Sequence, residues 1–309
     1  MKATVVRSTG SWYRIRKDDG SSCDARIRGK FRLDGLNTTN PIAVGDRVEC
    51  NSDEEGREVI TGIEPRRNYI IRRSNNLSRQ RQILAANLDR AILLITLAAP
   101  ATSTGFIDRF LLTCEAYHVP ALLLINKCDL LEGAEAEVEA FADMYRSIGY
   151  PVMLISALHG DGLEPLQALL RGQTTLLSGH SGTGKSTLIN RLIPGLDLKT
   201  GAISAQHQKG KHTTTFAEMH ALPFGGFIVD TPGIKGFGLV DIPKEELHHH
   251  FKEFFALLPQ CKFHNCLHLN EPGCAVHKAL EEGNVAPSRY NSYTSMYNDE
   301  EERSVYRNG

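Results

Sequence analysis

The order of its motifs is the feature that most constrains the fold of this chain. The stretch GHSGTGKST, from Gly179 to Thr187, matches the phosphate-binding pattern G-x4-G-K-[ST] and lies between an apolar strand pattern and a helical pattern. The segments NKCD (126–129) and SAL (156–158), which normally follow such a loop, precede it here. The fold must therefore bring an early base-reading segment beside a late phosphate-binding segment.

The glycine-rich loop predicts phosphate binding by its backbone. Its N–H groups are expected to surround the phosphates, Lys185 to reach the β and γ phosphates in a catalytic role, and Ser186 to bind Mg²⁺. ATPases and small-molecule kinases also have such loops, so the base must be identified elsewhere. The predicted phosphate-binding residues are Gly179, His180, Ser181, Gly182, Thr183, Gly184, Lys185, Ser186 and Thr187.

Two polar segments at the ends of successive apolar strands predict a guanine site. NKCD follows ALLLI, and the Asp129 carboxylate can accept hydrogen bonds from N1–H and the exocyclic amine of guanine, a donor pair that adenine lacks. The segment SAL ends VMLIS and offers a backbone N–H to guanine O6. NKCD alone is also typical of a polar turn, but both segments together predict a base site formed by Asn126, Lys127, Asp129, Ser156 and Ala157.

The remaining parts of a GTPase site follow the phosphate-binding loop. The segment DTPG ends the strand pattern GFIVD, which predicts Asp230 near Mg²⁺ through water and the Gly233 N–H near the γ-phosphate. The intervening KGKHTTTFAE contains Thr213, Thr214 and Thr215, one of which is expected to close over the metal. Thr214 is the candidate for Mg²⁺ binding and for catalysis.

This order of motifs predicts a circularly permuted GTPase domain. It results if the ends of an ordinary GTPase sheet are joined through a helix at 163–170 and a strand at 174–178, and the chain is reopened after DTPG. The ligand loops still gather at the carboxyl ends of parallel strands. Apolar runs alternate with helical patterns from about Leu88, which favours a sheet covered on both faces. Since DTPG leads directly into the C-terminal region, we expect the nucleotide state to reposition that region.

The first 65 residues show short alternating runs broken by turn residues, a pattern typical of a small β-barrel. In DARIRGKFR one strand face is entirely cationic. A solvated face neutralised by nearby aspartates is an equal alternative, but EPRRNYIIRRS (64–74) adds four arginines. We therefore predict RNA phosphate binding, without sequence readout, by Arg26, Arg28, Lys30 and Arg32.

Three of the seven cysteines lie close together near the C-terminus. The pattern Cys261-x4-Cys266-x-His268-x5-Cys274 offers four ligands within one segment, which suits a closed, structural Cys₃His zinc site. His264 and His277 are close enough to be alternative ligands. The other four cysteines are scattered and are expected to be small buried apolar residues.

Composition adds little about partners, because 35 Lys and Arg residues nearly balance 36 Asp and Glu residues among 309. The N-terminal residues contain no apolar signal region, and the longest apolar run, Ala91 to Ala99, is too short to span a bilayer. These features predict a cytoplasmic protein that does not interact with a membrane.

Together these motifs resemble the bacterial ribosome small-subunit-dependent GTPase A family. The match extends nearly end to end, through VGDRV, AANLDRAILLI, NKCD, SAL, GHSGTGKSTLIN, KGKHTTTFAE, DTPGIKGFGL and the cysteine pattern. The resemblance implies an OB-fold over residues 1–70, a permuted P-loop GTPase domain over 71–240 and a mainly helical zinc domain over 241–309. It also implies Mg²⁺ with GTP, and one structural Zn²⁺ bound by Cys261, Cys266, His268 and Cys274.

The resemblance further implies a monomeric GTPase acting in late maturation of the small (30S) ribosomal subunit. Its partners would be the 30S subunit, 16S rRNA and other assembly factors, and the subunit would stimulate hydrolysis. Relatives often have a basic tail, whereas this chain has NDEEER. The alternatives are a GTP-gated RNA-binding module with incidental hydrolysis, and a P-loop kinase, against which NKCD and DTPG argue.

The residue after DTPG suggests how hydrolysis differs from that of signalling GTPases. Those enzymes orient the attacking water with a glutamine at this position, but here it is Ile234, which cannot hydrogen-bond. We expect slow intrinsic turnover, with His212, beside the threonines of KGKHTTTFAE, as the residue that positions the water.

Overall fold

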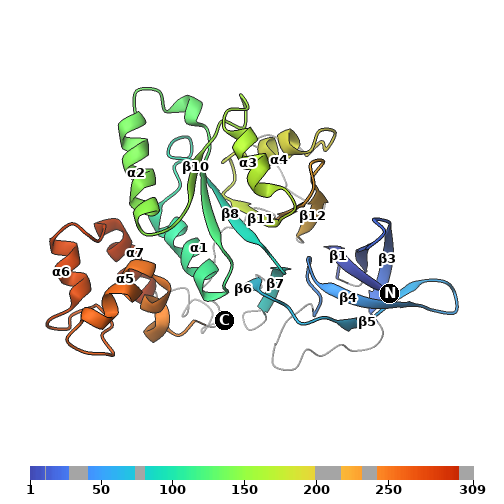
Figure 1. Cartoon of the computed structure of the whole chain (residues 1–309), viewed down its shortest axis with the longest axis horizontal. Helices are drawn as coiled ribbons and strands as arrows, with labels where there is room; N and C mark the ends of the chain where they lie inside the picture. Colours follow the sequence, from blue (N-terminus) through green and yellow to red (C-terminus); the bar gives the residue numbers. More distant parts are fainter. Residues whose placement is uncertain (11, 28–40, 74–80, 199–216, 232–241, 299–309) are drawn as a thin grey trace, which may run out of the picture.

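The structure, a computed structural model, describes residues 1–10, 12–27, 41–73, 81–198, 217–231 and 242–298. A β-barrel lies at one end of the molecule, an α/β domain in the middle and a group of helices at the other end (Figure 1). Within the described residues, no helix is both long enough and apolar enough to cross a membrane.

The N-terminal domain is a five-stranded barrel. Its strands follow the order β1-β2-β3-β5-β4, and a β1–β4 pairing closes them; β3 and β5 are parallel and the other pairs antiparallel. This arrangement confirms the predicted OB-fold. Alternate residues such as Val5, Ile15 and Ala25 point into the barrel core. The strands are β1 (Lys2–Ser8), β2 (Tyr13–Lys17), β3 (Ser22–Ile27), β4 (Arg47–Ser52) and β5 (Glu58–Ile63).

The central domain contains a mainly parallel sheet with strand order β10-β9-β8-β11-β13-β12. Only β12 is antiparallel to its neighbour within this part of the sheet, and it also pairs with β1 at Arg7 and Glu218, which joins the barrel to the sheet. The strands are β8 (Arg90–Ile95), β9 (Ala121–Ile125), β10 (Val152–Leu154), β11 (Thr174–Gly179), β12 (Glu218–Ala221) and β13 (Phe227–Asp230).

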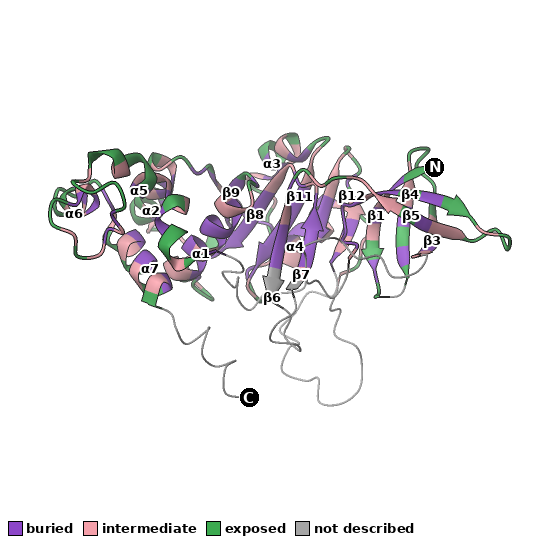
Figure 2. Ribbon diagram, turned by 90° about the horizontal axis from the view of Figure 1, so that it is seen from below, coloured by how far each residue is buried: buried purple, intermediate pink, exposed green. Residues whose placement is uncertain are grey.

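Helices cover both faces of this sheet, as the sequence pattern predicts. Helices α1 (Thr104–Ala116) and α2 (Glu135–Ser147) pack on one face, and α3 (Leu163–Leu170) and α4 (Lys185–Leu192) on the other. Strand β8 contributes alternate residues to the two cores, because successive side chains of a strand point to opposite faces. Figure 2 shows β8 and β11 largely buried between these layers.

A buried ion pair fixes the junction between the barrel and the central domain. Arg66 donates two hydrogen bonds of 2.6 Å to the fully buried Asp46, beside the hairpin of β6 (Tyr69–Arg73) and β7 (Arg81–Ala86). Gly45 has a φ of 92°, and a Cβ there would lie 2.1 Å from the Ala86 carbonyl oxygen. The segments VGDRV and AANLD therefore form a close-packed joint that requires glycine.

The C-terminal residues form a small helical unit that packs on α1. Leu112 of α1 belongs to its core together with Phe251, Phe254 and Tyr293, and α7 contacts α1 directly. The described elements here are η2 (Lys244–His250), α5 (Lys252–Leu257), η3 (Leu258–Gln260), α6 (Ala275–Glu281) and α7 (Pro287–Asn298); a short helix, η1 (Cys128–Leu130), lies in the central domain.

A buried charge network joins this helical unit to the central domain. Arg289 of α7 is 1% exposed and donates hydrogen bonds of 2.7 Å to Asp108 of α1 and to Glu253 of α5, while the Tyr145 hydroxyl donates to Asp108 at 3.0 Å. Burial alone would lower the pKa of Arg289, but the two carboxylates raise it above its usual value, so the guanidinium stays charged.

Removal of this buried cation is expected to destabilise the protein strongly. Arg289→Ala leaves Asp108 and Glu253 without their partner, and the free energy of unfolding should fall by about 3–5 kcal/mol in urea denaturation followed by circular dichroism. Arg146→Ala is the control, since Arg146 forms exposed pairs with Glu139 and Asp143 and should lose about 0–1 kcal/mol. Equal losses in the two variants would contradict the structural role of Arg289.

Candidate functional site

The predicted nucleotide-binding segments meet at one edge of the central sheet. NKCD follows β9, SAL follows β10, the glycine-rich loop follows β11, and Asp230 is the last residue of β13. Because these strands are parallel neighbours, their carboxyl ends lie at the same edge, where open α/β sheets bind ligands. The early and late motifs of the sequence are thus brought into one site.

Asn126 connects three of these segments through its side chain. Its Nδ2 donates to the Thr183 carbonyl oxygen at 2.7 Å, and its Oδ1 accepts from the Ala157 N–H at 2.9 Å. The side chain is buried, so the free energy cost of breaking either bond includes an unpaired polar group. The amide therefore fixes the spacing between the phosphate-binding loop and the base-reading loops.

Two positions of the phosphate-binding loop leave no space for a side chain and therefore require glycine. Gly184 has a φ of 94°, and a Cβ there would lie 2.4 Å from Asn126 Nδ2. A Cβ at Gly179 would lie 2.7 Å from the Leu94 carbonyl oxygen. Any larger residue would displace the backbone whose N–H groups are needed for phosphate.

The Asp129 carboxyl group is held in its ionised form, in which it accepts hydrogen bonds. The Ser156 hydroxyl donates to its carboxylate at 2.6 Å, and this hydrogen bond lowers the pKa of Asp129 below its usual value. Lys127 adopts a left-handed conformation, with a φ of 64°, and its Nζ donates to the Ala99 carbonyl oxygen at 2.6 Å. The base-reading loop therefore presents a carboxylate that is charged at neutral pH.

Lys185 and Asp230 form the charged centre of the phosphate side. The Lys185 ammonium donates to the Asp230 carboxylate and, at 2.6 Å, to the Thr231 carbonyl oxygen. Ser186 and Thr187 follow in the first turn of α4, where backbone N–H groups point toward the loop. This geometry suits a site that must hold both phosphate oxygens and a hydrated metal ion.

The loop after β8 also reaches this site, a feature that the sequence motifs did not reveal. The Phe106 ring, in the first turn of α1, lies 3.7 Å from the His180 ring between centroids, and burial lowers the pKa of His180. Pro100 lies beside Gly182. The available signal was positional, since β8 is one more parallel strand whose following loop must lie at the same edge.

The cysteine pattern forms a compact ligand cluster. The four ligand atoms of Cys261, Cys266, His268 and Cys274 all lie within 4.8 Å of one another. His268 Nδ1 is 3.6 Å from Cys261 Sγ and 3.4 Å from Cys274 Sγ, close to the spacing of about 3.5–3.8 Å for ligands of one tetrahedral Zn²⁺. The donor set and its geometry therefore fit zinc.

The protonation state of the histidine suits a metal ligand. Burial lowers the pKa of His268 to about 4, so the imidazole is neutral, as metal binding requires. Burial raises the pKa of the Cys266 thiol to about 12, so this thiol must lose its proton when a metal binds. The alternative histidine His277 instead shares a hydrogen bond with the Tyr290 hydroxyl, and His264 is exposed. His268 is therefore the histidine of the cluster.

Comparisons with known proteins agree with one another over nearly the whole chain. The family model of the RsgA N-terminal domain matches residues 2–60, and that of the RsgA GTPase matches residues 63–240. This chain belongs to the RsgA GTPase family. Two curated relatives, both named small ribosomal subunit biogenesis GTPase RsgA, come from Bacteroides fragilis (54% identical over 303 residues, covering 98% of each chain) and Christiangramia forsetii (53% over 306 residues, covering 98% and 97%).

Two solved structures are similar to this chain over nearly its whole length. YjeQ from Thermotoga maritima is 36% identical, with a TM-score of 0.78 and 96% of each chain covered. YloQ, described as a circularly permuted GTPase, is 30% identical, with a TM-score of 0.74 and coverage of 98% and 95%. The predicted GTPase fold, its permutation and the family resemblance are confirmed.

Several predicted residues lie outside the described part of the chain. Among the predicted GTPase residues these are His212, Thr214 and Gly233, together with the neighbouring Ile234; among the predicted RNA-binding residues they are Arg28, Lys30 and Arg32.

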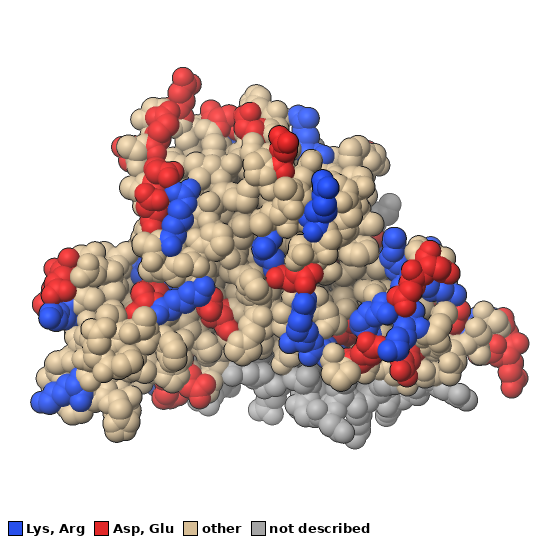
Figure 3. All heavy atoms as spheres, viewed as in Figure 1, with Lys and Arg blue, Asp and Glu red and all other residues tan. Residues whose placement is uncertain are grey.

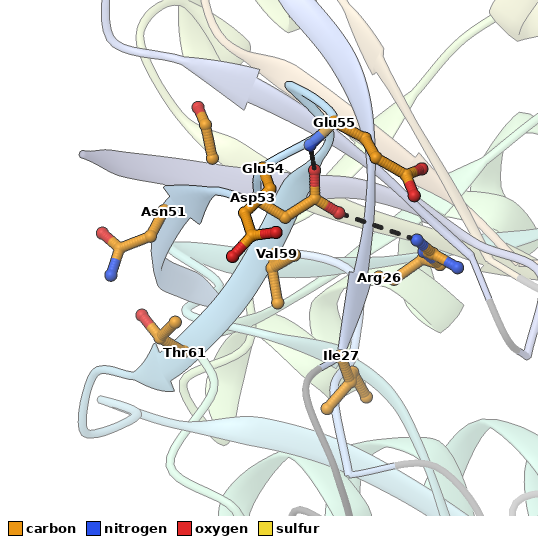
Figure 4. A pocket seen from close by; sticks show the side chains of 9 residues that line it. Arg26, Ile27, Asn51, Asp53, Glu54, Glu55, Val59 and Thr61 are labelled. Carbon is orange, nitrogen blue, oxygen red and sulfur yellow. Dashed lines mark hydrogen bonds and ion pairs between the residues drawn. The ribbon is translucent and has the colours of Figure 1, made fainter.

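Several of the arginines that the structure describes around the barrel lie beside carboxylates. Arg26 lies 3.8 Å from Asp53, beside a hollow that is also lined by Glu54 and Glu55 (Figure 4). Two of the arginines in EPRRNYIIRRS are structural, since Arg66 binds Asp46 and Arg67 pairs with Asp89 at 2.7 Å. Figure 3 shows cationic and anionic side chains interspersed over the barrel. Because Arg28, Lys30 and Arg32 lie outside the described residues, phosphate binding by this strand stays a prediction.

Gly184→Ala tests the geometry of the nucleotide site in this RsgA-family protein. The new Cβ meets Asn126 and the backbone is strained by about 1–2 kcal/mol, so GTP affinity measured by calorimetry should fall by roughly tenfold or more.

Gly195→Ala is the matched control, because Gly195 has a φ of 89° but no neighbouring atom within 4 Å of a new Cβ. It should lose stability and keep its GTP affinity. A Gly184→Ala variant with unchanged GTP affinity would show that the contact between Gly184 and Asn126 does not shape the site.

Proposed function

We propose that this GTPase acts in late maturation of the small (30S) ribosomal subunit. It binds the subunit through 16S rRNA and hydrolyses GTP to GDP and phosphate, with stimulation by the subunit. The observation that carries this proposal is the identity of more than half of all positions, over nearly the whole chain, with relatives named for small ribosomal subunit biogenesis.

The proposed role of each nucleotide-binding residue follows from its place in the site. Asp129 accepts from guanine N1–H and the exocyclic amine, and the segment SAL (156–158) offers a backbone N–H to guanine O6. Lys185 exchanges its contacts with Asp230 and Thr231 for phosphate oxygens when GTP binds. Asp230 is thereby released to hold water around Mg²⁺. The metal is held by the hydroxyls of Ser186 and Thr214.

For the attacking water we propose His212. The residue after DTPG is Ile234, whose side chain can neither donate nor accept a hydrogen bond, so another group must orient the water. An imidazole beside the threonines of KGKHTTTFAE can do this as an acceptor. The Gly233 N–H would contact the γ-phosphate.

We propose that the cysteine cluster holds one structural Zn²⁺. The four ligand atoms lie within 4.8 Å of one another, and four protein ligands complete a tetrahedral zinc site with no open position for catalysis. The cluster links η3, the segment after it and the start of α6, which otherwise share a small core. Residues 1–70, 71–240 and 241–309 stay our predicted domain limits, and the protein is proposed to be a cytoplasmic monomer.

GTP hydrolysis with and without small subunits tests the proposed function. At fixed salt, purified small subunits should accelerate turnover strongly and large subunits should not. His212→Ala should reduce the stimulated rate by roughly 10²–10⁴-fold while GTP still binds, and His220→Ala, on β12, should not. No stimulation by small subunits would leave the GTP-gated RNA-binding module, with incidental hydrolysis, as the better account.

Exchange of the base-reading carboxylate should change nucleotide preference. Asp129→Asn replaces one acceptor by a donor, so GTP affinity should fall by roughly 10- to 150-fold, the loss of a hydrogen bond to a charged group. Xanthosine triphosphate should then bind better than GTP, because xanthine has a carbonyl oxygen where guanine has its amine. A variant that still prefers GTP would contradict the assigned role of Asp129.

Zinc analysis tests the cluster independently of the nucleotide. Cys274→Ser should lose the bound zinc, measured by atomic emission, and the C-terminal helices should unfold at a lower temperature because zinc binding contributes to folding. Cys23→Ser, in the barrel, should keep the metal. Full zinc content in Cys274→Ser would contradict the Cys₃His assignment.

A further inference from the structure

A hollow of about 540 Å³ lies where the barrel meets the sheet of the GTPase domain. Strands β1, β2 and β3 and the turn between β1 and β2 form one side of it, and β12 forms the other side through Glu218 and Met219. Val6 and Met219 give it an apolar portion. Its volume is within the range of about 300–1,000 Å³ that is typical of sites for small organic groups.

The hollow contains two arginines with weak partners. Arg7 and Arg14 are directly opposite each other on β1 and β2, a like-charged arrangement that destabilises a strand pair. Arg14 lies 3.1 Å from Asp24 and Arg7 lies 3.9 Å from Glu218, and the arginine side chains are 48% and 52% exposed. Such exposed pairs contribute little stability, so an anion can replace the carboxylates at low cost.

The hollow also contains Trp12, the only tryptophan in the chain. The residue is 45% exposed, although indole is among the side chains that gain most from burial. The Arg26 guanidinium lies 5.2 Å from its ring centroid, which adds a third cation beside the hollow. An exposed aromatic ring flanked by cations is the arrangement with which proteins bind single-stranded nucleic acids.

We propose that this hollow binds an unpaired nucleotide of RNA. The base stacks on Trp12, and the adjoining phosphates contact Arg7 and Arg14. A nucleotide within a duplex cannot bind in this way, because its base faces are covered by neighbouring bases. This inference rests on the proposed function and names the RNA element that the barrel recognises: single-stranded rather than helical.

The site would link RNA to the GTPase centre over a short distance. Glu218, the partner of Arg7, is directly opposite Asp230 in the pairing of β12 with β13. RNA that displaces Glu218 from Arg7 therefore acts on the strand next to the one that carries Asp230. This gives bound RNA a direct contact with the sheet that holds the nucleotide.

Tryptophan fluorescence tests the proposal directly, because Trp12 is the only source of the signal. The full-length protein is titrated with an oligouridylate, with duplex RNA of equal length and with polyglutamate of equal charge. Binding is measured in parallel by the anisotropy of labelled RNA. The oligouridylate should quench the tryptophan emission over the same concentrations at which it binds, and the other two polymers should not.

Variants distinguish RNA binding in this hollow from non-specific electrostatic attraction of RNA to the protein. Trp12→Leu should weaken oligouridylate binding by about 5- to 150-fold, the loss of one stacked base. Arg7→Gln should weaken it too and should reduce the salt dependence by roughly 0.7 in the logarithmic slope, the value for one phosphate of a single strand. Arg57→Gln is the matched control, since Arg57 is 53% exposed, pairs with Glu55 and lies on the barrel away from the hollow.

Three results would overturn the proposal: RNA binding without a change in emission, equal quenching by polyglutamate, or equal effects of Arg7→Gln and Arg57→Gln. Failure of the proposed function is a separate result. Small subunits would then fail to stimulate GTP hydrolysis by the wild-type protein, while oligouridylate could still quench Trp12.

Discussion

The two hydrogen bonds of the Asn126 side chain hold the nucleotide site together. They join residues that are 57 and 31 positions away in the chain, and they do so inside a buried environment where an unpaired amide would be costly. The neighbouring strands bring these loops to one edge, and the amide then sets their spacing. This explains why the order of motifs in the chain is unimportant for the site: the contacts depend on which strands are adjacent, and the permutation leaves that unchanged.

Two buried ion pairs attach the flanking domains to this centre. Asp46 and Arg66 fix the barrel, while Asp108 and Arg289 fix the C-terminal helices to α1. Helix α1 also contacts the phosphate-binding loop through Phe106 and His180. A shift of the C-terminal helices between nucleotide states, which the permuted connection led us to expect, must therefore carry α1 along or separate a buried ion pair. Movement of α1 together with the C-terminal helices requires less free energy than separation of the ion pair, because an isolated buried charge is strongly unfavourable.

The sequence was informative wherever a local pattern determines the structure. Alternating residues predicted the barrel, apolar runs predicted the parallel strands, and the loops at the strand ends then followed from topology. The network around Arg289 was not visible, because its partner Asp108 is 181 residues away and an arginine in a polar helix gives no sign of burial. The partners of Arg66 and Arg67 were hidden for the same reason, because Asp46 and Asp89 become their neighbours only in the folded chain.

A crystal structure with a non-hydrolysable GTP analogue and Mg²⁺ would test the central claim most directly. The account predicts guanine against Asp129 and the segment SAL (156–158), phosphates within the loop from Gly179 to Thr187, and Lys185 moved from Asp230 to phosphate oxygens. Asn126 should keep both of its hydrogen bonds. A nucleotide bound elsewhere, or one bound here with Asn126 detached from Thr183 and Ala157, would contradict the view that this amide holds the permuted site together.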